Sequence, residues 1–475
     1  MQPRLRISQN NEKTQPLKKL GMGILLAGVT LLTGCGGQDP LELTIEPHPP
    51  QTFQSFDFEA ANNPQLRWNV TPVIDGNFIT STLPYGSLVD LVPTFEVPSG
   101  SPVYVNSELQ TSGATPQNFS QSLLYIIKDA NGGSSNFQVN LDQVVIGGNV
   151  QVSDLGIGVN QGVVTTLVGD GGAALLNSTH GLTFGEGALY FTEYVSHKIR
   201  KYDLSSGILT TLAGSGVAGF LDGTGTAAAF NNPSSLVSDG SYLYIVDASN
   251  TSIRKLNLAT NEVTTLAGSS TAGSNDGTGT AARFNGLNGI TYDGQYLYVA
   301  EQAPNHRIRR IDPSSGEVTT FAGDGAAATA DGIGRAASFN SPHSIVTDGR
   351  NLYVSQAADY RIRKVVISTG EVITVAGDGN PGLTDGIGTA AQLNHIYGLG
   401  MDRDYLYFSE DNNGVVRKMH LTTFEVSTLV GSGTPGFADG TGTAAQVDFP
   451  RSLASDGQAL YLADYNNNRI RKITP

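Results

Sequence analysis

The sequence predicts an all-β protein in which a small β-sandwich precedes a six-bladed propeller. Three observations support this fold class. An apolar run around a tyrosine occurs six times at a near-constant interval, each repeat holds four short strand-like runs, and the strands pair completely only if the chain closes into a ring. Repeats of this length stack because one unit cannot bury its apolar surface alone.

The tyrosine runs set the period of the repeat. Successive runs are 54 residues apart, with one interval of 55. They read ALYFTE at Tyr190, YLYIVD at Tyr244, YLYVAE at Tyr298, NLYVSQ at Tyr353, YLYFSE at Tyr407 and ALYLAD at Tyr461.

The repeat from 234 to 268 shows the strand content of one unit. Asp239-Gly240 separates its first two apolar runs, and such a pair favours a tight hairpin turn. The runs SIRKLNL and EVTTLAG follow, separated by the polar residues 259–261. All four runs are too short for helices and rich in β-branched residues. Four antiparallel strands per repeat form one propeller blade.

A glycine-rich insert joins each repeat to the next. It reads GFLDGTGTAAAFNNP at 219–233 and recurs as SNDGTGTAARF, TADGIGRAASF, LTDGIGTAAQL and FADGTGTAAQV. The Asp-Gly-x-Gly core needs backbone angles that glycine supplies at low cost. We interpret it as a structured crossover loop. A cation or phosphate loop is the alternative, although a phosphate loop needs a strand-to-helix context that is absent.

Strand counting predicts that the ring closes. The chain ends directly after the IRK-type strand around Arg471, so the last blade lacks an outer strand. A VTTL-type strand at 163–167 precedes every complete blade and is left over. A ring lets this early strand complete the last blade, whereas an open array exposes an apolar edge at each end.

Two of the repeats carry a family resemblance. LYVAE…NHRIRRID and LYLADYNNNRIRKI resemble the NHL repeat, and 163–475 resembles an NHL-repeat propeller. The longer form with DGTGTAA resembles repeats of bacterial surface proteins. The family includes lyases that act through histidine-held zinc or through histidine and glutamate bases, but their full catalytic sets find no match in this sequence.

Residues 1–35 form a targeting segment. A basic stretch precedes 13 apolar residues at 20–32, too few to span a bilayer. Leu32-Thr33-Gly34-Cys35 then resembles the bacterial lipobox, which implies cleavage before Cys35 and lipidation of its thiol; a stray buried cysteine is the alternative. Gly36 favours the outer membrane. Cys35 is the only cysteine, so no disulfide is expected.

Two further segments precede the repeats. Residues 36–51 form a polar, proline-bearing tether. Residues 52–143 contain short alternating strands and a hairpin turn at DANGG, and they resemble an immunoglobulin-like or cadherin-like sandwich. Residues 144–162 are the linker to the propeller.

The net charge of −14 limits the choice of partner. Much of the lysine and arginine lies in the IRK strands, so the remaining surface is acidic. Nucleic acid is therefore excluded as a partner, and membrane contact is expected through the lipid anchor only. A repelling acidic surface favours a soluble monomer.

Two registers of side chains should gather on one face of the ring. The first register, at the start of each blade, varies from blade to blade: His180, Ser234, Asn288, His343, Tyr397 and Arg451. The second register ends the tyrosine strand and is nearly constant: Glu193, Asp247, Glu301, Gln356, Glu410 and Asp464. Constancy indicates a structural role, such as pairing with the IRK arginines. Variation indicates a tolerated channel mouth or a shaped binding site.

The first register provides the candidate ligand-binding residues. Tyr397 and Arg451 suit sugar or carboxylate groups, and we expect alanine there, at His180 and at His343 to weaken binding with little loss of stability. His180 and His343 lie in opposite blades, and His395 could add a third imidazole. A plain polar channel mouth is favoured over a metal site, so no metal, cofactor or catalytic residue is assigned.

Together these features predict a lipid-anchored binding or scaffold protein of the bacterial cell envelope, with a protein or glycan as partner. The alternative is a propeller enzyme, a lyase or lactone hydrolase, that uses the histidines at the channel mouth.

Overall fold

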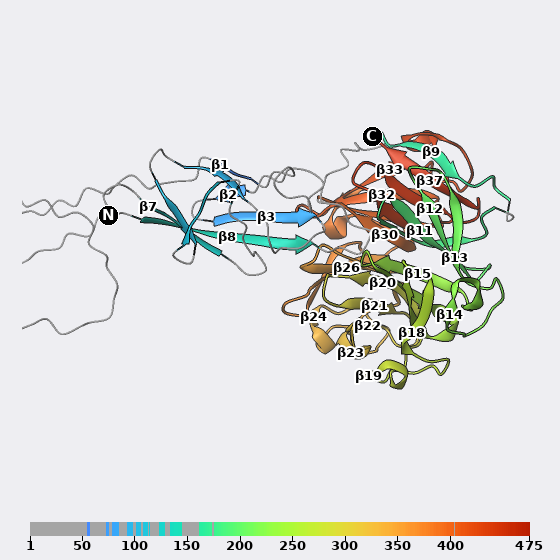
Figure 1. Cartoon of the computed structure of the whole chain (residues 1–475). Helices are drawn as coiled ribbons and strands as arrows, with labels where there is room; N and C mark the ends of the chain where they lie inside the picture. Colours follow the sequence, from blue (N-terminus) through green and yellow to red (C-terminus); the bar gives the residue numbers. More distant parts are fainter. Residues whose placement is uncertain are drawn as a thin grey trace, which may run out of the picture.

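The computed structural model describes twelve stretches of the chain (Figure 1). They are 55–57, 73–75, 78–84, 93–97, 101–105, 108–112, 114, 123–128, 134–144, 161–172, 175–402 and 404–475. The predicted leader with Cys35 and the tether 36–51 lie outside the described residues. Within the described stretches, no helix has the length and apolar character needed to cross a membrane.

The described residues before the repeats form two sheets. β1 (Ser55–Asp57) pairs with β4 (Thr94–Glu96). The second sheet has the order β2 (Val73–Asp75), β3 (Phe78–Pro84), β8 (Ser134–Val144), β7 (Leu123–Lys128), β5 (Val103–Val105) and β6 (Glu108–Leu109). β7 and β8 form the antiparallel pair expected around DANGG, whereas β3 and β8 run parallel. The rings of Phe95 and Tyr125, one from each sheet, lie 6.4 Å apart.

The repeats fold into six antiparallel sheets, which we number in chain order by their inner strands. The first contains β10 (Thr179–Gly185), β11 (Ala188–Glu193), β12 (Lys198–Asp203) and β13 (Leu209–Ala213). The second contains β15 (Pro233–Ser238), β16 (Tyr242–Asp247), β17 (Ser252–Asn257), β18 (Glu262–Gly268) and β14 (Gly223–Thr224). The third contains β20 (Leu287–Tyr292), β21 (Leu297–Glu301), β22 (Arg307–Ile311), β23 (Glu317–Ala322) and β19 (Gly277–Thr278).

The remaining three sheets follow the same order from the inner to the outer strand. The fourth contains β25 (Pro342–Thr347), β26 (Asn351–Gln356), β27 (Arg361–Val366), β28 (Glu371–Ala376) and β24 (Gly332–Ile333). The fifth contains β30 (Ile396–Met401), β31 (Tyr405–Glu410), β32 (Val415–His420), β33 (Glu425–Val430) and β29 (Gly386–Ile387). The sixth contains β35 (Pro450–Ser455), β36 (Leu460–Asp464), β37 (Arg469–Thr474), β9 (Val163–Val168) and β34 (Gly440–Thr441).

Each Asp-Gly-x-Gly insert supplies a fifth strand that the four-strand prediction lacked. Its first glycine and the following residue pair with the outer strand of the next sheet, as Gly223 does with Val263. The second glycine starts a 3-10 turn at positive φ, +59° for Gly225, where a side chain would be strained. The link before β10 lacks this motif, and the first sheet accordingly has four strands.

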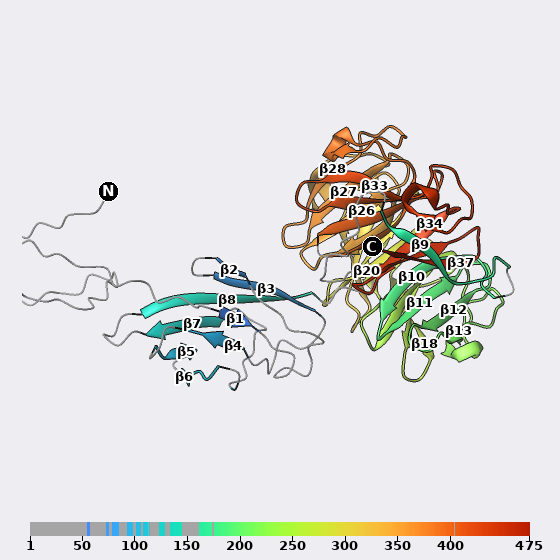
Figure 2. The ribbon, with the colours of Figure 1, turned by 90° about the horizontal axis from the view of Figure 1, so that it is seen from above.

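The leftover strand closes the sixth sheet. β9 pairs along β37, with Val163 opposite Thr474 and Val168 opposite Ile470, so the predicted pairing is confirmed. Figure 2 shows β9 beside the red strands β34 and β37. Inner strands contact one another in the cyclic order β10, β15, β20, β25, β30, β35 and back to β10. The Ser452 hydroxyl donates to the Leu182 carbonyl at 3.3 Å and links the last sheet to the first.

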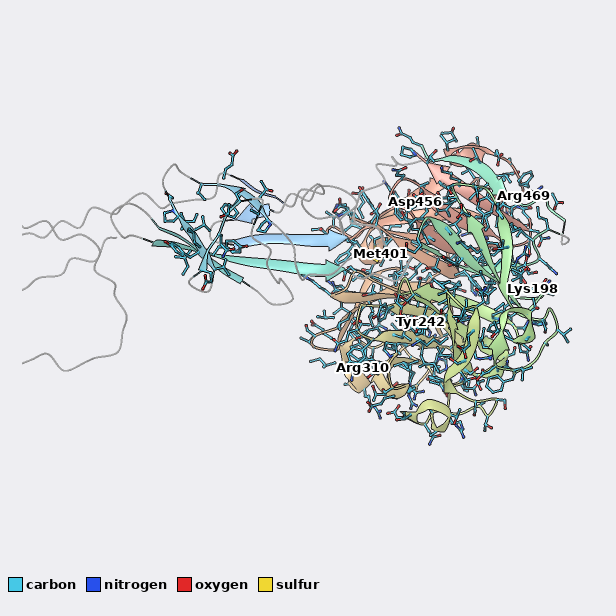
Figure 3. All side chains as sticks on the ribbon, in the orientation of Figure 1. Lys198, Tyr242, Arg310, Met401, Asp456 and Arg469 are labelled. Carbon is cyan, nitrogen blue, oxygen red and sulfur yellow. The ribbon has the colours of Figure 1, made fainter. Side chains whose placement is uncertain are left out.

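The repeated tyrosine anchors each hairpin and fills the space between sheets. The Tyr407 hydroxyl donates to Asp402 at 2.6 Å, and Tyr461 and Asp456 form the same pair at 2.7 Å. Side chains occupy the gaps between the ribbons of neighbouring sheets (Figure 3). Met401, labelled there, is fully buried with residues of the fourth and fifth sheets. The core is therefore divided among the sheet-to-sheet contacts.

Candidate functional site

The structure brings the first register together where the inner strands begin. Its six members are the second residues of β10, β15, β20, β25, β30 and β35. Hydrogen bonds connect five of them around and across the ring. His180 Nε2 lies 2.7 Å from the Tyr397 hydroxyl, His343 Nε2 lies 3.1 Å from Asn288 Nδ2, and the Ser234 hydroxyl donates to the Asn288 carbonyl at 3.1 Å.

Both register histidines use both of their ring nitrogens. His180 Nδ1 lies 2.8 Å from the Ser234 carbonyl, and His343 Nδ1 lies 3.0 Å from the Tyr397 carbonyl. A carbonyl can only accept, so Nδ1 carries the proton in each ring. Each Nε2 then accepts, from the Tyr397 hydroxyl in one case and from the Asn288 amide in the other. Both rings are therefore neutral and fixed in one tautomer.

Burial keeps these imidazoles neutral. It lowers the pKa of His180 to about 3, with the charge of Arg451 acting in the same direction. Burial also lowers the pKa of His343 well below its ordinary value, helped by His180 and Arg451. A protonated ring would lose one accepted hydrogen bond and lie close to a guanidinium.

We predict that this pair makes the fold sensitive to mild acid. The unfolded chain binds a proton on His180 below about pH 6.5, whereas the folded chain does not until about pH 3. The lowered pKa of His343 acts in the same direction. Their contribution to stability is thus complete above pH 6.5 and is lost as the pH falls. Between pH 7 and 5 His180 should lower the free energy of unfolding by about 2 kcal/mol, and His343 should lower it further. Urea titration at both pH values should show a smaller decrease for His180→Gln; an unchanged decrease would contradict this.

The expectation that His180 and His343 line an opening is wrong. Only 6% of His180 and 4% of His343 is exposed. The Tyr397 ring contacts both, with ring centroids 5.3 Å from His180 and 3.9 Å from His343. His180 lies in the first sheet and His343 in the fourth, on opposite sides of the ring. The inner strands approach one another closely enough for Tyr397 of the fifth sheet to contact both imidazoles. Alanine at either histidine would therefore leave a cavity and unpaired polar groups, so it should reduce stability.

Arg451 lies over aromatic rings and makes no hydrogen bond to a described residue. Its guanidinium carbon is 3.4 Å from the centre of the Tyr397 ring, 4.8 Å from that of Tyr465 and 5.1 Å from that of Phe449. The nearest carboxylate oxygen, of Asp411, is 3.6 Å from Nη1. The side chain is 12% exposed, and its buried Nε has no partner among the described residues. Stacking on these rings positions the guanidinium, and its terminal N–H groups make no hydrogen bond to a described residue.

Asp411 connects Arg451 to a half-exposed histidine. His395 Nδ1 lies 2.7 Å from Asp411 Oδ1, and 36% of the His395 side chain is exposed while only 1% of Asp411 is. The carboxylate therefore accepts from His395 on one oxygen and lies close to Arg451 on the other. His395 lies beside Tyr397, with ring centroids 6.3 Å apart.

Sequence reasoning missed a second variable register. It directly follows the constant carboxylate and reads Tyr194, Ala248, Gln302, Ala357, Asp411 and Tyr465. Tyr194 stacks on His180 with ring centroids 5.0 Å apart, and Tyr465 meets the same ring edge-on at 6.1 Å. The signal that could have found this register is the one that identified the first register. The residue type varies from repeat to repeat at this position, whereas the preceding position is nearly constant.

Two bulky residues occupy strained backbone positions beside this cluster. The register two residues before the first adopts positive φ in every sheet, and elsewhere it holds Ser, Asn or Gly. His395 has φ +32° and Phe449 has φ +53°. Such angles cost about 1–3 kcal/mol for bulky side chains and concentrate at functional sites. The strain falls in the fifth and sixth sheets, the sheets that carry Tyr397 and Arg451.

The second register and the IRK arginines have the predicted structural role. Arg309 is fully buried, and it contacts Glu301 at 3.0 Å and Asp276 at 2.8 Å. Asp276 is the aspartate of an Asp-Gly-x-Gly insert, which explains why the motif requires a carboxylate. The same arrangement recurs at Arg254, Arg363, Arg417 and Arg471, with Gln356 replacing the inner carboxylate at Arg363.

These insert aspartates are therefore used within the fold, which argues against the alternative of a cation loop. In the described part of the chain, no group of three or more His, Cys, Asp or Glu side chains could hold a metal ion.

Comparison with known proteins supports the type of repeat. No protein-family profile matches the chain. Protein SUPPRESSOR OF QUENCHING 1, chloroplastic, of Arabidopsis thaliana is 30% identical over 276 residues, which are 54% of this chain and 26% of that protein. Human NHL repeat-containing protein 2 is 25% identical over 297 residues, 54% of this chain and 41% of that protein. The repeats form an NHL-type propeller. The chain thus matches less than half the length of either relative.

Three solved structures that align with this chain have TM-scores below 0.5. Two are auxiliary nutrient binding proteins, from Bacteroides thetaiotaomicron and Bacteroides ovatus, at 14% and 16% identity and a TM-score of 0.49. Each alignment covers 90% of this chain and 98% or 99% of the other. A streptogramin B lyase is 15% identical with a TM-score of 0.42, over 66% of this chain and 98% of the lyase.

Proposed function

We propose that the protein is a lipid-anchored binding protein of the bacterial cell envelope, built as a sandwich module followed by a closed six-bladed NHL propeller. Its site is the cluster of Tyr194, Tyr397, Tyr465, Arg451 and His395, which we call the tyrosine–arginine site. The partner is a protein or glycan that presents a carboxylate or sugar hydroxyls there. The anchor at Cys35 and the outer-membrane location rest on the lipobox resemblance.

The guanidinium of Arg451, which lies near Asp411 but makes no hydrogen bond to a described residue, carries this proposal. Five IRK arginines of the same ring have partners on both terminal nitrogens, although the buried Nε of each has none among the described residues. Arg309, for example, donates through Nη1 and Nη2 to two carboxylates and two backbone carbonyls. Arg451 is nearly as buried but donates to no described residue within hydrogen-bond distance. The terminal N–H groups of Arg451 therefore differ from those of the IRK arginines, and a ligand carboxylate would accept from them in a two-pronged geometry.

The neighbouring side chains fit the same ligand chemistry. Tyrosine rings offer broad apolar faces for a sugar ring, and their hydroxyls add polar contacts. The site is a group of aromatic and arginine side chains, the residue types that dominate binding energy at interfaces. His180 and His343 contact Tyr397 and hold it in place, and both of their ring nitrogens are already occupied, so neither is assigned a ligand contact.

We predict that Arg451→Ala weakens binding of the envelope partner by tenfold or more, because truncating a central arginine removes about 2 kcal/mol or more. The partner is captured from envelope extracts on the immobilised chain and titrated by calorimetry. Arg335→Ala is the matched control, because Arg335 is 64% exposed and lies on an insert remote in sequence from the site. Equal affinity of the Arg451→Ala and parent chains, both folded, would overturn the assignment of the site.

One observation favours an enzyme as the second candidate. Asp411 orients His395 through Nδ1, which leaves Nε2 of a half-exposed imidazole as a possible general base. This replaces the pair His180 and His343 as the basis of the lyase or lactone hydrolase alternative. Turnover of model lactones by the parent chain but not by His395→Ala would favour the enzyme over the binding protein.

A further inference from the structure

The outer edge of the first sheet differs from the other five. Each of the other sheets ends in a two-residue strand donated by an Asp-Gly-x-Gly insert. The first sheet ends at β13, and no described strand pairs with its outer side. Ile208, directly before β13, is 58% exposed, and Thr210 and Thr211 are exposed as well. An open, partly apolar strand edge is a template for pairing with another segment.

The covered sheets define the backbone contacts that this edge lacks. In the second sheet the Gly225 amide donates to the Asn261 carbonyl at 2.8 Å, and Gly223 lies opposite Val263. Gly207 and Leu209 hold the corresponding positions in the first sheet. Among the residues that the structure describes, nothing donates to the Gly207 carbonyl or pairs with the outer side of Leu209.

The side chains show the same gap independently. In the second sheet, Asp222 accepts from Arg254 Nη2 at 2.7 Å and from the amide of Thr265 at 3.2 Å. Arg200 is the counterpart of Arg254. It contacts Glu193 through Nη1 at 2.9 Å and the Thr210 carbonyl through Nε at 3.3 Å. Its Nη2 has no partner in the described part of the chain, although the side chain is only 13% exposed.

The residue at the edge is also unlike its counterparts. Four of the five covered sheets place a glutamate opposite the insert strand: Glu262, Glu317, Glu371 and Glu425. The first sheet places Ile208 there without a strand to cover it. Charged side chains commonly protect exposed edges from pairing, and this edge has an apolar one.

We propose that the outer edge of the first sheet binds an extended segment of a partner protein by β-strand addition. The segment carries an aspartate followed by small residues, in the manner of Asp-Gly-x-Gly. Its carboxylate would accept from Arg200 Nη2 and the Thr211 amide, while its backbone would pair with Leu209 and Gly207. All five Asp-Gly-x-Gly inserts of this chain already complete their own sheets, so a second copy has no free insert to donate, which favours a different protein as the donor. The edge is distinct from the tyrosine–arginine site.

The test uses a peptide with the sequence of residues 219–230, GFLDGTGTAAAF, with blocked ends. The fluorescently labelled peptide should bind the full chain saturably with one site, as measured by anisotropy. A peptide with asparagine in place of its aspartate should bind about tenfold more weakly, because a charge-assisted hydrogen bond is lost. Leu209→Pro should abolish binding, since it removes the outward amide at an edge position that tolerates proline. Equal binding of the two peptides, or no binding at millimolar concentration, would overturn the proposal.

Amide hydrogen exchange provides a second readout that does not depend on a variant. Without peptide, the segment 208–212 should exchange faster than the matched segment 262–266, whose outer side is covered. Peptide should slow exchange in 208–212 only. Equal protection of both segments in the free chain would show that this chain or a second copy already covers the edge, and would also overturn the proposal.

Discussion

Deletion of 163–168 should reduce the yield of soluble monomer several-fold, the largest effect that we expect from any short change in this chain. These residues form β9, which lies between β37 and β34 in the sixth sheet. Val164 is fully buried beside Leu460 and Ile473. Removing the strand exposes this cluster and leaves β37 with an unpaired edge, which favours aggregation. Size-exclusion chromatography of freshly purified protein measures the outcome.

Restoring the strand at the other end of the chain is the matching control. Because β9 runs antiparallel to β37, residues 162–168 can be attached after Pro475 through an Asn-Gly turn. This rearranged chain should recover the monomer, since the sixth sheet regains all its strands. A deletion variant that stays monomeric with an unchanged melting temperature would contradict closure through β9.

Two adjacent valines of β9 test whether burial determines the loss of stability. Val164→Ala removes buried carbon atoms and should cost about 2 kcal/mol of unfolding free energy. Val163→Ala should cost clearly less, because Val163 is partly exposed. Urea unfolding of both variants provides the comparison.

The closure of the sixth sheet could be predicted because every repeat is expected to contain the same number of strands. Every strand needs a partner, so one missing strand at the end and one extra strand at 163–167 imply each other. The fifth strands could not be found in the same way. A segment such as Gly223-Thr224 has no alternation of apolar and polar side chains, and its pairing depends on where the insert folds back.

The sequence predicted which positions of the repeat form the candidate site, but not how deeply their side chains are buried. Comparing repeats within one chain separates constant from variable positions, and this identified Tyr397 and Arg451. Whether His180 is exposed depends on how closely six inner strands approach one another, which no single repeat specifies. The contact between Asp276 and Arg309 could not be predicted either, because the two residues are 33 positions apart in the sequence.

Arg309→Ala should lower the free energy of unfolding by about 3–5 kcal/mol, because it leaves a buried carboxylate without its counterion. Both Arg309 and Glu301 are fully buried, 3.0 Å apart. Chemical denaturation of the full chain measures the loss. Adding Glu301→Gln to Arg309→Ala should recover part of it, since the amide carries no charge. The fourth sheet supports this expectation, because Gln356 naturally accepts from Arg363 at 3.0 Å.

Arg335 supplies a control that shares a partner with Arg309. Both arginines contact Asp276, at 2.9 Å and 2.8 Å, but Arg335 is 64% exposed. Arg335→Ala should therefore cost less than about 1 kcal/mol, as exposed ion pairs usually do. If the two alanine variants lose equal stability, the buried contact to Glu301 contributes nothing, and the repeated arginine is no structural brace. If only Arg309→Ala is strongly destabilised, the constant registers hold the sheets together, and the variable registers are free to form a site.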